Sequence, residues 1–381
     1  MKDHMDNILK LAYSRNASDI HITAGKPPMI REKGEMVALE NYPALTAEHT
    51  KKLIYSIISE TQQKDFEAKL ELDCSYYIRD LCRFRVNVMM QKECTEAVLR
   101  IIPSKIPQAK DIGLSDAILS FSKLPRGLVL VTGPTGSGKS TTLAALIEVI
   151  NQSRKDHIIT VEDPIEFVYE AKSCVIRQRE VGSDTHTFLN ALKHVLRQDP
   201  DIILVGEMRD LETISLAITA AETGHLVFAT LHTQDAAQTI DRIIDVFPSH
   251  QQQQVRVQLA NTLEGVVCQQ LLPKIDGKGR VAAREVMMVT PAISNLIREG
   301  KTHQIYSAID TGAKFGMVSM DSTLLELVKQ RLITVDLALS KSSNPESLRG
   351  RITALGMVGG AGPAMGQRPM PPGPAQMGRK L

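Results

Sequence analysis

The sequence contains no tryptophan, and aromatic residues make up only 4% of its 381 residues. Its charges nearly cancel, with 45 Lys and Arg against 43 Asp and Glu and a formal net charge of +2. Nucleic-acid-binding proteins usually combine a basic face with stacking aromatic side chains, so the composition argues against a nucleic-acid partner. A balanced charge also provides no global field that would hold an anionic membrane.

The chain has five cysteines and no C-x-x-C pair: Cys74, Cys82, Cys94, Cys174 and Cys268. Structural zinc sites need ligands at such short spacings, so we expect reduced, packed thiols and no structural metal. No apolar run approaches the roughly 18 to 20 residues that cross a bilayer, and the N-terminus lacks the apolar core of a signal peptide. We therefore expect a cytoplasmic protein without a transmembrane segment.

The first part of the chain, residues 1–105, predicts a small α+β domain. It begins with a helical pattern, continues with the strand-like residues 19–23, and ends with β-rich stretches around residues 74–89. Prolines at Ile101-Ile102-Pro103 and Ile106-Pro107 interrupt regular structure, so residues 106–112 are expected to form a linker.

Residues 113–350 predict a larger α/β domain. Apolar strands alternate there with amphipathic helices, which is typical of a mainly parallel sheet covered on both faces. The expected strands are 128–132, 158–161, 202–205 and 226–230, and the expected helices include 188–197 and 211–223. Short helices are expected after residue 289. The last part, residues 351–381, is rich in Gly, Pro and Met and predicts a disordered tail.

A phosphate-binding loop reads G-P-T-G-S-G-K-S and lies between the first of these strands and a helical pattern. Its glycines let backbone N–H groups turn toward an anion, and the positive end of the following helix points to the same place. The lysine supplies a charge for the β and γ phosphates, and the serine hydroxyl binds the Mg²⁺ of Mg-ATP. The predicted nucleotide-binding residues are Gly133, Pro134, Thr135, Gly136, Ser137, Gly138, Lys139, Ser140 and Thr141.

Acidic residues follow two other strands, where a parallel sheet would bring them to the phosphate loop. Glu207 is the predicted general base that orients and deprotonates the attacking water, and Glu166 is the second candidate. Glu162 and Asp163 are expected to hold Mg²⁺, mostly through water, or to fix their loop. A lone acid after a strand is more often a helix cap, but two such strand ends behind one phosphate loop weaken that alternative.

Two histidines flank the strand at 226–230. His225 and His232 could sense the γ-phosphate or hydrogen-bond across the sheet, and the structural role is the alternative for each. His232 is the stronger candidate for a functional role.

Four boxes in this order resemble the ATPase superfamily that drives type II secretion and type IV pili. They are G-P-T-G-S-G-K-S at 133–140, I-T-V-E-D-P-I-E at 159–166, D-P-D-I-I-L-V-G-E-M-R-D at 199–210 and G-H-L-V-F-A-T-L-H-T at 224–233. Further segments are similar to its pilus retraction ATPases: A-S-D-I-H-I-T at 17–23, R-F-R-V-N at 83–87, L-L-P-K at 271–274 and L-I-R-E-G-K-T-H-Q-I at 296–305.

The resemblance implies a RecA-like ATPase domain preceded by a PAS-like domain, assembled as a homohexamer. It implies that arginines of the small domain reach the nucleotide; the matching positions are Arg85 and Arg100, with Arg83 a weaker candidate. ATP hydrolysis would drive an inner-membrane pilus platform protein from the cytoplasmic side, so that pili retract. A paralogous retraction ATPase is a further partner of such motors. Ser294 departs from the family pattern, which has arginine there.

Other functions remain open from the sequence alone. Within the same class, the chain could be an accessory retraction paralogue or an assembly or secretion ATPase, although it lacks the tetracysteine element and long N-terminal region common in the latter. A RecA-like nucleic-acid translocase and a nucleotide-gated scaffold without turnover belong to different classes. Intact Lys139 and Glu207 argue against the scaffold.

Overall fold

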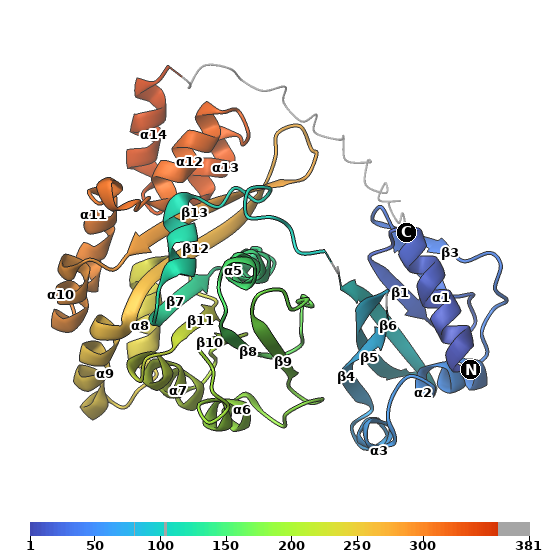
Figure 1. The fold of residues 1–381 in the computed structure, drawn as a ribbon. Helices are drawn as coiled ribbons and strands as arrows, with labels where there is room; N and C mark the ends of the chain where they lie inside the picture. The colour runs from blue at the N-terminus through green and yellow to red at the C-terminus, as the bar shows by residue number, and fades with distance from the viewer. Residues whose placement is uncertain (80, 103–104, 357–381) are drawn as a thin grey trace, which may run out of the picture.

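The computed structural model describes residues 1–79, 81–102 and 105–356, which form two β-sheets, each with its own helices and apolar core (Figure 1). A small domain that mixes helices with an antiparallel sheet precedes a larger, mainly parallel α/β domain, which confirms the predicted fold class. The PAS-like character of the small domain and the exact domain boundaries stay predictions.

The small domain has a six-stranded sheet in the order β3-β2-β1-β6-β5-β4, with all neighbours antiparallel. Period-2 alternation buries one face: Phe84, Val86 and Val88 of one strand are fully buried. Its elements are α1 (Lys2–Ser14), β1 (Asp19–Ile22), β2 (Met29–Glu32), β3 (Glu35–Ala38), α2 (Ala47–Tyr55), α3 (Glu60–Lys69), β4 (Glu71–Ile78), β5 (Cys82–Gln91) and β6 (Cys94–Ile102).

Two features of this domain differ from the sequence-based expectation. Ile101 and Ile102, where the sequence predicts an interruption of regular structure, are the last residues of a strand, because they pair with Phe84 and Arg83 of the neighbouring strand. Helix α3 was not predicted because only Phe66 of it is buried, so it has no apolar stripe; the Ser59 capping box defines its start.

The larger sheet has seven strands in the order β13-β12-β7-β11-β10-β8-β9, and only the β12–β13 pair is antiparallel. Its strands are β7 (Gly127–Thr132), β8 (His157–Glu162), β9 (Val175–Glu180), β10 (Ile202–Val205), β11 (Leu226–Leu231), β12 (Leu263–Pro273) and β13 (Arg280–Met288). Four of these lie where strands were predicted. The other three, β9, β12 and β13, were not predicted; β9 is mostly polar, and β12 contains adjacent glutamines.

Helices cover both faces of this sheet (Figure 1). In β7, Val129 and Val131 face α4 and α5, whereas Leu128 and Leu130 face the core that α6 to α10 share. The helices are α4 (Asp116–Ser120), α5 (Lys139–Ser153), α6 (Phe188–Val195), α7 (Leu211–Glu222), α8 (Ala236–Asp245), α9 (Ser249–Thr262), α10 (Pro291–Glu299), α11 (Ile305–Asp310), α12 (Met320–Lys329), α13 (Val335–Lys341) and α14 (Pro345–Ala354).

The last helix extends beyond the predicted start of the tail. Helix α14 continues to Ala354 because Leu348 and Ile352, four residues apart, are both fully buried against α12 and α13. The tail was therefore placed too early at residue 351, and residues 357–381 lie outside the described residues.

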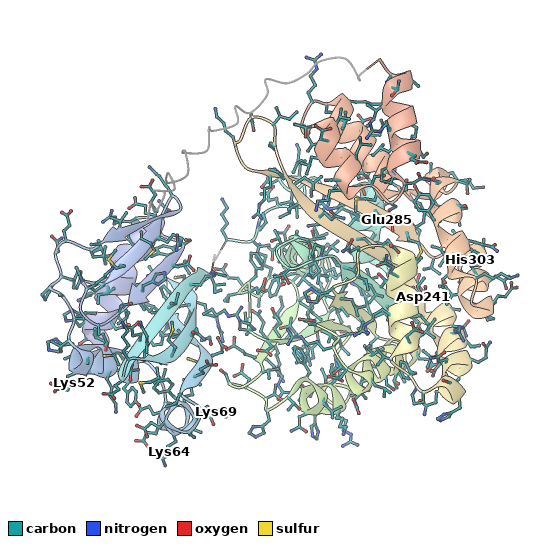
Figure 2. The ribbon with its side chains drawn as sticks, turned by 180° about the vertical axis from the view of Figure 1, so that it is seen from behind. Lys52, Lys64, Lys69, Asp241, Glu285 and His303 are labelled. Carbon is teal, nitrogen blue, oxygen red and sulfur yellow. The ribbon has the colours of Figure 1, made fainter. Side chains whose placement is uncertain are left out.

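A buried carboxylate joins the sheet to the starts of two helices, α8 and α12. Glu285 of β13, labelled in Figure 2, accepts hydrogen bonds from the N–H groups of Ala236 (2.9 Å) and Met320 (3.4 Å), at the starts of α8 and α12. Burial raises the pKa of Glu285 to about 7, against these two hydrogen bonds, which lower it. Within the part of the chain that the structure describes, no helix is long and apolar enough to span a membrane.

Candidate nucleotide-binding site

The phosphate loop joins β7 to α5, as the sequence predicts. Gly133, Gly136 and Gly138 have φ angles of 138°, 76° and 87°, a region that residues with a side chain rarely adopt. Helix α5 begins at Lys139 without a side-chain cap, so its first N–H groups remain directed at the loop. This end of the sheet is built to receive an anion.

The lysine of the loop lies against the loop itself. Its Nζ donates hydrogen bonds to the carbonyl oxygens of Gly133 (2.7 Å) and Pro134 (3.2 Å). Burial lowers the pKa of Lys139, and the negative charges of Glu207 and Glu166 oppose that effect. The charges of both predicted catalytic carboxylates therefore favour the protonated form of Lys139.

The loop fits a bound phosphate chain. Ser137 Oγ is buried without a hydrogen-bond partner, so the loop holds a polar atom that its own residues do not satisfy. Ser140 and Thr141 are half-buried at the first turn of α5, where a hydroxyl can reach a nucleotide-bound cation. Over residues 1–79, 81–102 and 105–356, no cluster of three or more His, Cys, Asp or Glu side chains could hold a metal by itself.

Glu207 and His232 meet at the carboxyl ends of two neighbouring strands. Glu207 follows β10 and His232 follows β11, and His232 Nε2 lies 2.9 Å from Glu207 Oε1. Arg209 donates to the other carboxylate oxygen at 2.8 Å. This hydrogen bond lowers the pKa of Glu207 against the effect of burial, and the charges of His232 and Lys139 lower it further. The carboxylate is held ionised and oriented.

The acidic box after β8 divides into buried and exposed residues. Glu162 is buried and accepts hydrogen bonds from Thr160 (2.6 Å) and Gln178 (3.2 Å). Burial raises the pKa of Glu162 to about 6 against these bonds. Asp163 and Glu166 are exposed, so their carboxylates are available to a ligand. Glu162 therefore supports the loop, and Asp163 and Glu166 are its accessible acids.

His225 lies at the wrong end of its strand for a contact with phosphate. It precedes β11, its carbonyl accepts from Gly127 N at the start of β7, and its ring lies 2.9 Å from Ala220 O. The loop lies at the opposite, carboxyl end of β7. The suggested phosphate-sensing role of His225 is therefore wrong, because the residues before and after a strand lie at its opposite ends.

The predicted arginines of the small domain lie side by side on its sheet. Arg85 of β5 is exposed and directly opposite Arg100 of β6. Like charges in opposite positions repel, and Asp19 offsets the pair by accepting from Arg100 Nε at 2.8 Å. The Arg85 side chain is exposed to solvent. Among the described residues, neither arginine forms a hydrogen bond with the phosphate loop of its own chain.

Arg83, the weaker candidate, connects the two domains within the chain. Its Nη2 lies 2.8 Å from Glu180 Oε2 at the end of β9, the edge strand of the larger sheet. The same oxygen accepts from Ile165 N of the acidic box at 2.9 Å. This contact could not be predicted from the sequence, because Glu180 belongs to none of the recognised boxes.

Gln269 and Arg284 were also missed, since nothing in their local sequence marks them. Gln269 Nε2 donates to Ser137 O of the phosphate loop at 2.6 Å. A Cβ on Gly133 would lie 2.1 Å from Gln269 O, and one on Gly138 would lie 2.7 Å from Gln269 Nε2. Two of the loop glycines are thus needed for close packing on β12 as well as for their φ angles.

Comparison with known proteins identifies the class. Residues 1–295 match the family model described as Type II/IV secretion system protein. The chain belongs to this family of secretion and pilus ATPases.

Several relatives place the chain within that family. It is 53% identical over 345 residues to the type IV pilus retraction ATPase PilT of Pseudomonas aeruginosa, with 90% of this chain and 100% of that protein covered. It is 48% identical to a twitching motility protein of Neisseria gonorrhoeae (84% and 86% covered) and 39% identical to the type IV pilus ATPase PilU of Pseudomonas aeruginosa (90% and 90% covered). The crystal structure of the pilus retraction motor PilT with bound ADP superposes with a TM-score of 0.85 at 49% identity, over 90% of this chain and 98% of that one. The predicted resemblance to pilus retraction ATPases is confirmed.

Proposed function

We propose that this chain hydrolyses ATP and that its hexamer uses the energy to retract type IV pili. The observation that carries this proposal is the intact phosphate loop at the same end of the parallel sheet as Glu207, on a chain that matches a retraction ATPase over 90% of its length. The crystal structure of the related retraction motor contains bound ADP, which supports ATP as the nucleotide.

The residues of the loop bind the triphosphate, and Lys139 exchanges its contacts with two loop carbonyls for the phosphate oxygens. Glu207 orients the attacking water and accepts its proton, while Arg209 and His232 keep the carboxylate in place. Glu166 is the alternative base. Ser140 would hold Mg²⁺ directly and Asp163 would hold it through water, while Glu162 supports the loop that carries Asp163. A bound Mg²⁺ would offset part of the phosphate charge.

The exposed arginines complete a neighbour's site in the proposed hexamer. Arg85 and Arg100 are on one exposed sheet face, so a second subunit can present a nucleotide to them. Arginines offset the charge that develops on transferred phosphate, which makes hydrolysis depend on assembly of the ring. The output acts on an inner-membrane platform protein from the cytoplasmic face.

Two other assignments compete with retraction. An accessory role is supported by the 39% identity to PilU, but the identity to PilT is higher over the same share of the chain. An assembly or secretion ATPase is the second alternative, and the similarity to retraction ATPases disfavours it.

The catalytic part of the proposal is tested with the purified chain. Wild type should bind ATP and release phosphate, whereas Lys139→Ala should lose both because the phosphates lose a charge partner. Lys314→Ala, an exposed lysine in the short helix Ala313–Phe315, is the control and should match wild type. Unchanged affinity and turnover in Lys139→Ala would overturn the assignment of this loop.

A further inference from the structure

Two buried side chains connect the phosphate loop to the end of the interdomain linker. Gln269 and Arg284 are direct cross-strand partners on β12 and β13, and only 2% and 8% of their surfaces are exposed. They lie next to the loop because β12 pairs with β7, with Cys268 opposite Thr132, so that Gln269 comes beside Gly133.

Gln269 uses both ends of its amide. Its Nε2 donates to Ser137 O at 2.6 Å, and its Oε1 accepts from Thr142 Oγ1 at 2.8 Å, one residue after the predicted loop residues. Arg284 Nε donates to the same oxygen at 2.7 Å. The amide therefore holds the loop and the first turn of α5, and Arg284 fixes which way the amide faces.

Arg284 directs its remaining donors to the linker. Nη1 donates to Gly113 O and Nη2 to Ile112 O, both at 2.9 Å. All three acceptors of the guanidinium are neutral oxygens. Burying a charge among neutral partners costs free energy, so stabilisation of the core does not explain why an arginine occupies this position.

The linker contacts are placed where domain movement would act. Residues 106–112 precede the larger domain, and a tight turn closes on Gly113, whose N–H donates to Lys110 O at 3.1 Å. A displacement of this turn would pull on Arg284, release or rotate the Gln269 amide, and change the shape of the phosphate loop. The same path works in the other direction when the loop closes on phosphate.

We propose that Gln269 and Arg284 are positioning residues that couple nucleotide binding at the phosphate loop to the position of the interdomain linker. The inference rests on the proposed binding of nucleotide at this loop. Neither residue lies in a box that the sequence analysis recognised. Together they connect the presence or absence of nucleotide at the loop to the conformation of the linker that joins the two domains.

The test measures ADP affinity and hydrogen–deuterium exchange of the full chain with and without ADP. In wild type, ADP should slow exchange in the phosphate loop and change it in residues 105–114. Arg284→Lys keeps the charge but cannot reach all three acceptors, so the loop should still respond to ADP and residues 105–114 should not. Gln269→Met should weaken ADP binding about 10-fold, because it leaves buried hydrogen-bonding groups unpaired.

Arg280→Lys is the matched control, since Arg280 is exposed on the same strand, and it should behave as wild type. A merely structural role predicts a lower melting temperature with unchanged ADP affinity and an intact response of residues 105–114, and that result would overturn the inference. A wild-type linker that does not respond to ADP would overturn it too, even if a variant fails to fold. No protection of the loop in wild type would instead contradict the proposed nucleotide binding.

Discussion

His232 Nε2 lies 2.9 Å from Glu207 Oε1, across the ends of the adjacent parallel strands β10 and β11. Arg209 occupies the other oxygen of the same carboxylate. A carboxylate held from both sides is well oriented, and its lowered pKa keeps it ionised at neutral pH. Each carboxylate oxygen has two acceptor sites, so Glu207 can accept a proton from water while Arg209 and His232 remain in place.

Glu207→Gln should reduce ATP turnover about 100-fold or more while ATP binding persists, because the amide cannot accept the proton of water. Steady-state phosphate release and nucleotide binding measure the two effects. Glu166→Gln is the matched variant and should be milder. If Glu166→Gln abolishes turnover and Glu207→Gln does not, Glu166 is the general base and the roles of the two residues are exchanged.

Arg85 and Arg100 should act on a neighbour's nucleotide, since both lie on one exposed face of the small domain. Subunits with Arg85→Ala and Arg100→Ala, mixed with Glu207→Gln subunits, should recover part of the turnover that each lacks alone. Arg83→Ala subunits serve as the comparison, because Arg83 pairs with Glu180 of its own chain. Intact hexamers without any rescue would show that each site is complete within one chain.

Glu285 should make stability depend on pH. Its pKa is raised from 4.5 to about 7, so between these values the folded chain binds more protons than the unfolded one and stability falls as pH rises. The free energy of unfolding of wild type, relative to that of Glu285→Gln, should therefore fall by up to about 1.4 kcal/mol per pH unit from pH 5 to 7. Denaturant unfolding followed by circular dichroism measures this; curves that stay parallel would contradict it. The pKa of Glu162 is also raised, but Glu162 is present in both proteins and its effect cancels.

We expect the exposed face of helix α10 to couple ATP hydrolysis to pilus retraction. Ile297 is fully buried and unsuitable for a test of function, whereas Asn295 and Arg298 are exposed. Asn295→Ala with Arg298→Ala should leave ATP turnover within about twofold of wild type, because surface changes cost little stability. Twitching should be lost in cells that carry the double variant. Normal twitching would place the coupling surface elsewhere.

The sequence supported the fold of the larger domain because its buried parallel strands are continuous apolar runs, as in Leu128–Val131 and Ile202–Val205. It could not show β9 or α3, whose residues are mostly polar and are ordered by their neighbours. The loop and Glu207 were marked by local motifs. Gln269, Arg284 and Glu180 were not, because their roles arise from contacts between residues far apart in the chain.

The most direct test of a retraction motor is made in cells that lack this protein, by counting surface pili and measuring twitching. A retraction role predicts cells that make pili, often more than wild type, but do not twitch, because extension continues without retraction. Wild-type protein should restore twitching, and Lys139→Ala should not. Cells without pili would contradict retraction in favour of assembly, and normal twitching would reduce the protein to an accessory role.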